Sequence, residues 1–349
     1  MTRPYAAFAT KGLEDVAYAE LAELLGQRLI KPQVGTKHVL FATSADADTL
    51  RGLTTVDDVC QLVADPTAVS TADDLREIVV EQADFSSALE QVAALRPLDE
   101  TFSVTVTAAR SPVGSSREIA EIVEVSLAQR LGWQVRRHTR APIDVRVFLD
   151  GDAALLGVRV FAGPLSDRPY RLVHRKGALR PTVAAAMVRL ACDDGRPHRL
   201  WDPFCGSGTI LAEAALAGHT AYGSDLDPAA VAATTANLTT LPAGLGAQVE
   251  LADAASEDSW RRHNNVDTVV TNLPWGKQIA IDAGTRMYAQ VGLGVARLAG
   301  RGGRACLLTT EPDRLAAAIR RAARDLPVTR RQLGLLGQVP WLLTVGHYR

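Results

Sequence analysis

Apolar positions recur with helical spacing near the start of the chain and as short runs further on. Leu13, Val16, Leu21 and Leu25 follow one another at helical intervals, and Gly26 comes directly after them. This spacing predicts an amphipathic helix that ends at the glycine. Short apolar runs predict strands on either side of the helix, at residues 4–10, 39–43 and 56–63. Residues 1–67 are therefore expected to form a small α+β domain.

A second α+β pattern follows over residues 68–165. Helical segments are predicted within residues 71–95, and residues 102–107 alternate with the period of a strand. Ser115 and Glu118 have the spacing of a capping box, which predicts the start of a helix that Gly132 ends. Two more strands are expected at residues 143–149 and 153–161.

Strands and helices alternate from Pro181 to the end of the chain, which is typical of a parallel, doubly wound sheet. Residues 328–336 and 341–348 are both strand candidates and have no helix between them. They predict an antiparallel hairpin at the edge of that sheet. Residues 166–180 contain one proline, four arginines and one lysine, and are expected to be a basic linker.

Composition narrows the class of protein. The chain has 349 residues, of which 47% are hydrophobic and 22% charged, and its mean hydropathy is close to zero. Such values are typical of globular proteins, and no apolar run approaches the roughly 20 residues of a membrane helix. The start of the chain has no signal-peptide pattern, and the four cysteines are scattered. We expect a cytoplasmic protein without a membrane or metal partner.

The net charge of −1 hides an uneven distribution. Residues 1–100 carry a net charge of −9, whereas residues 101–349 carry +8. Clustered basic residues can neutralise phosphates even when the whole chain is slightly acidic. The alternative is an ordinary solvated surface.

The glycine-rich segment from Asp202 to Thr209 (Asp-Pro-Phe-Cys-Gly-Ser-Gly-Thr) lies where a predicted strand passes into a helix. Gly206 and Gly208 permit positive φ and a close approach of the backbone to a ligand. The helix that starts near Thr209 directs free N–H groups at the same place. The segment is neither a dinucleotide fingerprint nor a P-loop, so other nucleotide-like cofactors are favoured.

Carboxylates follow the next two strands. Asp225 ends a strand about 20 residues after the glycines, where a carboxylate can bind both hydroxyls of a ribose. Asp227 is the alternative, although its place before a helix also suits a cap. Asp253 and Ala254 follow the third strand, where an adenine amino group would be recognised.

Residues 271–277, Thr-Asn-Leu-Pro-Trp-Gly-Lys, follow directly after a predicted buried strand. Taken alone, they could form an ordinary turn with a buried tryptophan. Because these residues follow the fourth strand of the same predicted sheet, Asn272 and Trp275 are expected to lie across a crevice from the glycine loop.

These motifs resemble those of class I methyltransferases that methylate amino groups. The order of glycine loop, ribose acid, adenine acid, Asn-x-Pro-aromatic and terminal hairpin covers residues 181–349. This family has Pro where Leu273 stands, but only the backbone carbonyl of that residue is needed. The resemblance implies a seven-stranded Rossmann-like sheet and S-adenosyl-L-methionine as cofactor. It assigns cofactor binding to Thr182, Asp202, Pro203, Phe204, Cys205, Gly206, Ser207, Gly208, Thr209, Asp225, Leu226, Asp253, Ala254 and Asn272, and catalysis to Asn272, Leu273, Pro274 and Trp275.

The first half of the chain resembles a ferredoxin-like domain (residues 1–67) followed by a THUMP domain (residues 68–165). Arg110, the helix start at residues 115–118 and residues 165–171 carry this resemblance. The whole is similar to tRNA guanine-N2 methyltransferases that act on the acceptor stem, which implies a monomer that binds tRNA or another structured RNA. The basic residues expected to contact RNA are Arg136, Arg137, Arg140, Arg171, Arg175, Lys176 and Lys277.

Several alternatives stay open at the level of sequence. The same site could methylate guanine N2 in ribosomal RNA, adenine N6, or a protein amide. The chain could also be an RNA-binding protein with a vestigial methyltransferase fold, or a small-molecule methyltransferase. The nucleotide position and the number of methyl groups added do not follow from the motifs.

Overall fold

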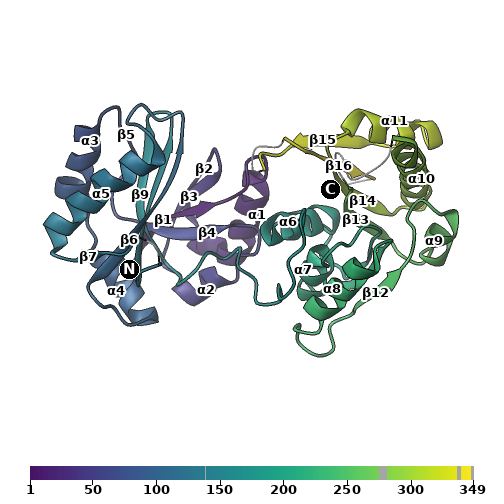
Figure 1. The fold of residues 1–349 in the computed structure, drawn as a ribbon, viewed down its shortest axis with the longest axis horizontal. Coiled ribbons are helices and arrows are strands. Elements are labelled where there is room, and N and C mark those ends of the chain that lie inside the picture. Colours follow the sequence, from purple (N-terminus) through teal and green to yellow (C-terminus); the bar gives the residue numbers. More distant parts are fainter. Residues whose placement is uncertain (138, 275–280, 336–338, 347–349) are drawn as a thin grey trace. The chain divides into compact units, whose positions relative to one another are not determined.

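The chain divides into two compact units (Figure 1). The computed structural model describes residues 1–137, 139–274, 281–335 and 339–346, without the side chains of residues 281–283. The first unit contains Met1–Ala9 and Ala17–Leu165, and the second contains Thr10–Val16 and Ser166–Arg349.

One sheet runs through the whole first unit. The strand order is β2 (Ile30–Gly35), β3 (His38–Thr43), β1 (Arg3–Phe8), β4 (Asp58–Leu62), β9 (Ala153–Arg159), β8 (Ile143–Asp150), β6 (Thr101–Ala109) and β7 (Gln134–Val135), with β5 (Thr67–Ala68) also paired to β9. Because β4 pairs with β9, strands from both predicted amino-terminal domains share one hydrogen-bonded sheet. The boundary at residue 67 stays a prediction.

Buried charges join the two parts of this sheet. The Arg159 guanidinium donates from Nε to Asp58 Oδ2 at 2.8 Å and also pairs with Asp144. All three side chains are at most 4% exposed. Breaking a buried pair leaves an uncompensated charge, so Arg159 on β9 requires its acidic partners on β4 and β8.

The helices before residue 165 are α1 (Glu14–Leu25), the 3-10 turn η1 (Gly26–Arg28), α2 (Ala47–Arg51), α3 (Ala72–Glu77), the π-helical turn η2 (Ile78–Gln82), α4 (Ser86–Leu95) and α5 (Ser116–Leu131). Of these, α1, α3, α4 and α5 lie where the sequence predicts helices. Ser115 and Glu118 form the predicted capping box, and Gly132 ends α5 in the left-handed conformation. Ile119, Val123 and Leu127 of α5 pack in the core below it.

The second unit contains a seven-stranded sheet in the order β12 (Ala247–Leu251), β11 (Thr220–Asp225), β10 (Arg199–Asp202), β13 (Thr268–Asn272), β14 (Arg304–Thr309), β16 (Trp341–Val345) and β15 (Val328–Gln332). The first five strands are parallel, and β16 runs antiparallel to both β14 and β15. The predicted doubly wound sheet with a terminal hairpin is confirmed.

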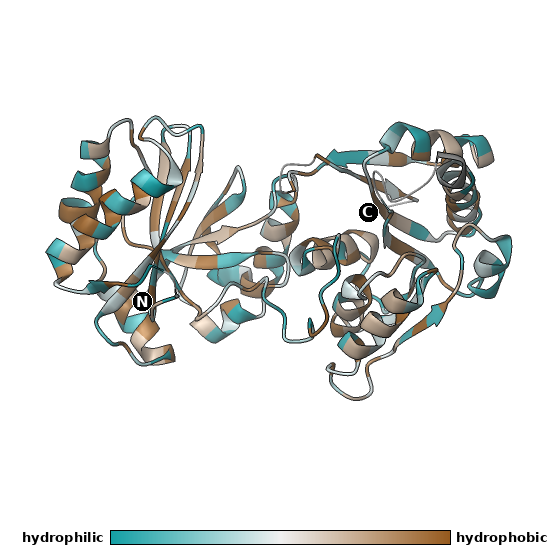
Figure 2. Cartoon of the chain, viewed as in Figure 1, coloured by the Kyte–Doolittle hydropathy of each residue, from teal (hydrophilic) through white to brown (hydrophobic). Residues whose placement is uncertain are grey.

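Helices cover both faces of this sheet: α6 (Pro181–Ala191), α7 (Thr209–Leu216), α8 (Pro228–Leu238), α9 (Glu257–Arg262), α10 (Ile281–Ala299) and α11 (Pro312–Ala322). Alternate strand residues face opposite sides. Val270 packs in the core of α6 and α7, whereas the adjacent Val269 packs in the core of α10 and α11. Figure 2 shows hydrophobic residues along the strands and hydrophilic residues on outer helix faces such as that of α11.

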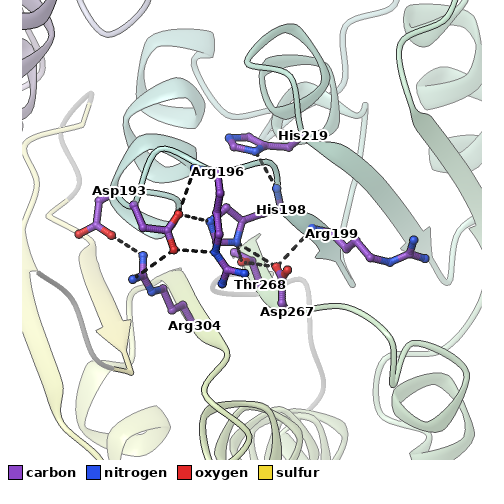
Figure 3. A network of polar contacts seen from close by, with 9 residues as sticks. Asp193, Arg196, His198, Arg199, His219, Asp267, Thr268 and Arg304 are labelled. Carbon is purple, nitrogen blue, oxygen red and sulfur yellow. Dashed lines mark hydrogen bonds and ion pairs between the residues drawn. The ribbon is translucent and has the colours of Figure 1, made fainter.

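A network of charges ties together the amino ends of three parallel strands (Figure 3). His198 precedes β10, and its ring nitrogens lie 3.0 Å from Asp267 Oδ1 and 2.8 Å from Asp194 Oδ1. Asp267 precedes β13, and Arg304, the first residue of β14, pairs with Asp194 at 3.5 Å. This end of the sheet is closed by the network, so a ligand site is expected at the carboxyl ends, where doubly wound sheets bind ligands.

Helix α9 is absent from the sequence-based expectations. It has six residues, five of them polar or charged, so no apolar period marks it. Its Trp260 is held by tertiary contacts: the indole donates to Ala254 O at 3.0 Å and meets the Trp201 ring edge-on at 4.8 Å.

Gly292 permits close packing of α10 on α11, and its replacement tests that packing. A Cβ at this position would lie 2.6 Å from Ala318 Cβ and 2.7 Å from the Ala318 carbonyl carbon. Overpacking of this kind costs about 1–3 kcal/mol, more than the ~1 kcal/mol that alanine gains over glycine within a helix. We expect Gly292→Ala to lower the thermal unfolding midpoint of the chain. The exposed Ala289→Ser on the same helix is the control, and an unchanged midpoint for Gly292→Ala would contradict the observed packing.

Candidate active site

The glycine-rich segment forms a loop between β10 and α7 at the carboxyl end of the sheet. Gly206 and Gly208 have φ values of 58° and 78°, as the sequence predicts. The Gly208 N–H donates to Cys205 O at 2.7 Å, which closes the turn before the helix. Thr209 is the first residue of α7, so the free N–H groups of that helix face the loop.

The two glycines serve different purposes. A Cβ at Gly206 would meet no atom within 4 Å, whereas a Cβ at Gly208 would lie 2.7 Å from Thr234 Cγ2 on α8. Gly206 therefore leaves an open approach to the backbone, and Gly208 permits contact with α8. Pro203 and Cys205 lie buried beneath the loop, Ser207 is also buried, and Phe204 is half-buried.

Asp202 lies at the base of the loop and is 1% exposed. Its Oδ1 accepts hydrogen bonds from Thr271 Oγ1 at 2.5 Å and from the Phe204 N–H at 3.0 Å. Burial raises the pKa of this carboxyl to about 7, and the nearby Asp225 carboxylate adds to the shift. The Asp202 carboxyl thus bridges the loop and β13.

The Asp225 side chain lies against the glycine loop, at the end of β11. Its Oδ2 accepts from the Gly206 N–H at 2.9 Å, and its Oδ1 accepts from the Asp227 N–H at 3.0 Å. A carboxylate has about four lone-pair sites, so two further hydrogen bonds from ribose hydroxyls remain feasible.

Asp227, the alternative ribose ligand, caps α8 as the sequence suggests. Its Oδ1 accepts from the Ala229 N–H at 2.9 Å, and its Oδ2 pairs with Arg175. The hydrogen bond from Ala229, together with Arg175, lowers the pKa of Asp227. Both carboxylate oxygens therefore have structural partners.

The predicted adenine-binding residues follow strands that neighbour one another. Asp253 is exposed beyond β12, and its Oδ1 accepts from the Ala255 N–H at 2.8 Å. Ala254 is buried. Leu226, directly after Asp225, is 69% exposed, so an apolar surface lies beside the carboxylate. Their roles in binding adenine stay predictions.

Asn272 is the last residue of β13, the strand that pairs with β10. Its Oδ1 is buried and has no hydrogen-bond partner among the residues that the structure describes. An unsatisfied buried acceptor costs about 1–3 kcal/mol. The catalytic and cofactor-binding roles expected of Asn272 stay predictions.

The surroundings of Leu273, which stands where the related family has proline, are apolar and accommodate its side chain. Leu273 is fully buried among Met287, Val291 and their neighbours, and its N–H donates to Leu308 O at 3.0 Å. Pro274 is half-buried. Trp275 and Lys277, predicted to stack on a base and to bind RNA, lie outside the described residues.

The predicted RNA-binding arginines of the first unit are partly neutralised. Arg136 pairs with Asp99 at 2.6 Å and Arg137 with Glu124 at 2.8 Å, while Arg140 is exposed. In the linker, Lys176 is exposed and Arg171 half-buried.

Thr182 lies at the start of α6 and is 1% exposed. Its role in cofactor binding stays a prediction.

Two polar residues of α8, Thr234 and Asn237, contact the glycine loop from its buried side. Neither residue is predicted from the sequence. Their only signal is that they lie three positions apart, which places them on one helix face.

This arrangement of strands, loop and ligand-facing residues is the class I methyltransferase fold. Residues 168–336, just under half of the chain, match the family described as "RMKL-like, methyltransferase domain". Among the described residues, no helix is long and apolar enough to cross a membrane, and no group of side chains could hold a metal ion.

Relatives of known activity match part of the chain. A tRNA (guanine(6)-N2)-methyltransferase of Thermus thermophilus is 34% identical over 55% of this chain and 59% of its own length. The human U6 snRNA (guanine-N(2))-methyltransferase THUMPD2 is 28% identical over 48% of this chain and 32% of its own length. The chain thus spans less than two thirds of these curated relatives.

Solved structures match the chain along its whole length. The crystal structure of TrmN from Thermus thermophilus has a TM-score of 0.74 and 27% identity, with full coverage of both chains. A putative methyltransferase, SMU.472 complexed with SAH, also has a TM-score of 0.74, at 18% identity, and shows similarity of fold alone.

The titration of Asp202 makes stability depend on pH. Because burial raises its pKa from 3.8 to about 7, the folded state favours the protonated carboxyl. The stabilising contribution of this group is complete below about pH 4 and decreases as pH rises to about 7, by on the order of a few kcal/mol. Asp202→Asn does not titrate. We expect the unfolding free energy of wild type, relative to Asp202→Asn, to decrease across this window in denaturant titrations. A constant difference would contradict the assignment.

Proposed function

We propose that this chain is an S-adenosyl-L-methionine-dependent methyltransferase that modifies an exocyclic amino group of a base in structured RNA. The observation that carries the proposal is the buried Oδ1 of Asn272, which has no hydrogen-bond partner within the described part of the chain. It ends the strand beside β10, whose loop presents Gly206 with open space above it. A donor group on a substrate would satisfy this oxygen.

The residues at the loop fit the proposed cofactor. Gly206 admits a close approach to the backbone, and Asp225 retains acceptor sites for two ribose hydroxyls. Leu226 offers an apolar surface for an adenine, and Asp253 an acceptor for its amino group. Thr182 and residues 202–209 complete the proposed site. When bound, S-adenosyl-L-methionine supplies an electrophilic methyl group on a sulfonium.

Asn272 would orient the nucleophile. The lone pair of an exocyclic amine is delocalised into the base, so the amine is a poor nucleophile. By accepting its two N–H bonds, Asn272 Oδ1 and the Leu273 carbonyl turn the lone pair toward the methyl group, which is catalysis by positioning and electrostatics. A carboxamide is not a base at neutral pH, so the proton lost by the methylated amine passes to water. Trp275 would stack on the base, a contact worth about 1–3 kcal/mol.

We infer that the substrate is guanine N2 in the acceptor stem of tRNA. The similarity to a tRNA guanine-N2 methyltransferase supports this choice. Residues 1–67 and 68–165 would act as ferredoxin-like and THUMP domains that bind the RNA. Lys176 is exposed and Arg171 is half-buried, so both can be reached by phosphates. A base in a duplex must be flipped out, which costs a few kcal/mol that RNA contacts must offset. We also propose that the protein acts on tRNA as a monomer in the cytoplasm.

Removal of the Asn272 amide tests the mechanism. In Asn272→Ala, we expect methyl transfer to unmodified bulk tRNA to fall at least about a hundredfold, the size seen when one aligned transition-state hydrogen bond is lost. Binding of S-adenosylhomocysteine should stay nearly unchanged. The exposed Asn264→Ala is the matched control. The measurement is mass spectrometry of digested tRNA, with calorimetry for binding.

Two results would overturn parts of the proposal. Full turnover in Asn272→Ala would remove the assigned role of the amide. A methylated adenosine in place of N2-methylguanosine, or methylation of ribosomal RNA alone, would replace the substrate while leaving the chemistry intact.

A further inference from the structure

The linker over residues 166–180 is held on the second unit by side chains of α7 and α8. Arg168 Nε and Tyr170 Oη both donate to the buried Glu213 of α7, at 2.9 and 2.7 Å. Burial and the Glu213 carboxylate raise the pKa of Tyr170. Beyond this anchor, Leu172 is 63% exposed and Val173 38% exposed. The middle of the linker therefore depends on polar contacts for its position.

Asn237 of α8 supplies those contacts. Its Oδ1 accepts from the Val173 N–H at 2.8 Å, and its Nδ2 donates to Val173 O at 3.1 Å. The amide pairs with the linker as a neighbouring strand would. The second Nδ2 hydrogen is donated to Ser207 O in the glycine loop, at 2.8 Å. This residue is 2% exposed, and the opposite orientation of its amide would place donor against donor.

Thr234, one helical turn earlier on the same face of α8, holds the adjacent loop carbonyl. Its Oγ1 donates to Gly206 O at 3.1 Å. Because peptide units are planar, the positions of these two carbonyls also set the orientation of the N–H groups of Ser207 and Gly208. The face of α8 that includes Thr234 and Asn237 thus sets two consecutive peptide planes of the loop.

A third linker contact is an exposed ion pair between Arg175 and Asp227, the cap of α8. Exposed pairs contribute little to stability. Asn237, by contrast, is buried and contacts both the middle of the linker and the loop. A change on one side of this amide changes its hydrogen bonds on the other.

We propose that Asn237 is a positioning residue that couples the linker to the cofactor loop. A docked linker holds the loop ready for the cofactor, and a bound cofactor holds the linker docked. The coupling is reciprocal by thermodynamic necessity. This inference rests on the proposed function, because it requires a cofactor at Gly206–Gly208. Phosphates of an RNA that engage Arg171 or Lys176 would, through this amide, change the affinity for the cofactor.

Asn237→Asp is the first test. A carboxylate still accepts from the Val173 N–H but cannot donate to Val173 O or Ser207 O. We expect S-adenosylhomocysteine to bind about tenfold more weakly by calorimetry, since the carbonyl oxygens of Val173 and Ser207 lose their donor. In wild type, S-adenosylhomocysteine should slow trypsin cleavage after Arg171, Arg175 and Lys176. This protection should be absent in the variant.

Val173→Pro tests the coupling from the other side of the amide. It removes the N–H that donates to Asn237 and leaves both Asn237 and the loop unaltered. The proposal predicts weaker binding of S-adenosylhomocysteine and faster linker cleavage here too. Thr235→Val, on the exposed side of α8, should match wild type. Val295→Ala, in the core of α10, should lower the unfolding midpoint without changing affinity.

The outcomes separate the two claims. If wild type does not bind S-adenosylhomocysteine, the proposed function fails. If wild type binds it, and Asn237→Asp and Val173→Pro bind it equally well with the linker still protected, the coupling is wrong and the function stands. If only Asn237→Asp weakens binding, Asn237 supports the loop but transmits nothing from the linker, and the coupling is again overturned.

Discussion

The hydrogen bond from the Gly206 N–H to Asp225 is the interaction on which the candidate site depends. It joins the loop after β10 to the end of β11, so it fixes the backbone at Gly206 relative to the Asp225 carboxylate that we propose to bind a ribose. Thr234 and Asn237 hold the carbonyls of the same loop from below. The loop is thus held by its N–H groups on one side and its carbonyls on the other, before any ligand binds. Preorganisation of this kind lowers the entropy lost on binding.

The two ends of the sheet have opposite properties. At the amino end, His198, Asp194, Asp267 and Arg304 satisfy one another and tie β10, β13 and β14 together. At the carboxyl end, Asn272 Oδ1 is buried and has no hydrogen-bond partner among the residues described. The polar groups are thus paired with one another at the amino end, whereas the carboxyl end has an acceptor that a substrate can satisfy under the proposed function.

Much of this arrangement could be predicted from local patterns. The glycine loop, the carboxylate of Asp225 and the strand end at Asn272 follow from residue type and from the order of strands in a doubly wound sheet. The cap at Asp227 also follows from its position before a helix. These features depend on a few neighbouring residues, which a sequence displays directly.

Contacts between distant segments could not be predicted in this way. Val173 and Asn237 are 64 positions apart. A valine and an asparagine so far apart in sequence give no sign that they form a hydrogen bond. Helix α9 is short and mostly polar, so it shows no apolar period. The edge-on contact of the Trp260 ring with the Trp201 ring helps to hold it in place. The continuity of the first sheet through β4 and β9 likewise depends on the buried pair between Arg159 and Asp58, 101 positions apart.

A crystal structure of the full chain with S-adenosylhomocysteine would show where the cofactor binds. We predict that the ligand lies along Gly206–Gly208, with its ribose hydroxyls on Asp225 and its sulfur facing Asn272. A ligand bound elsewhere, a ribose held by Asp227, or no binding at all would contradict it.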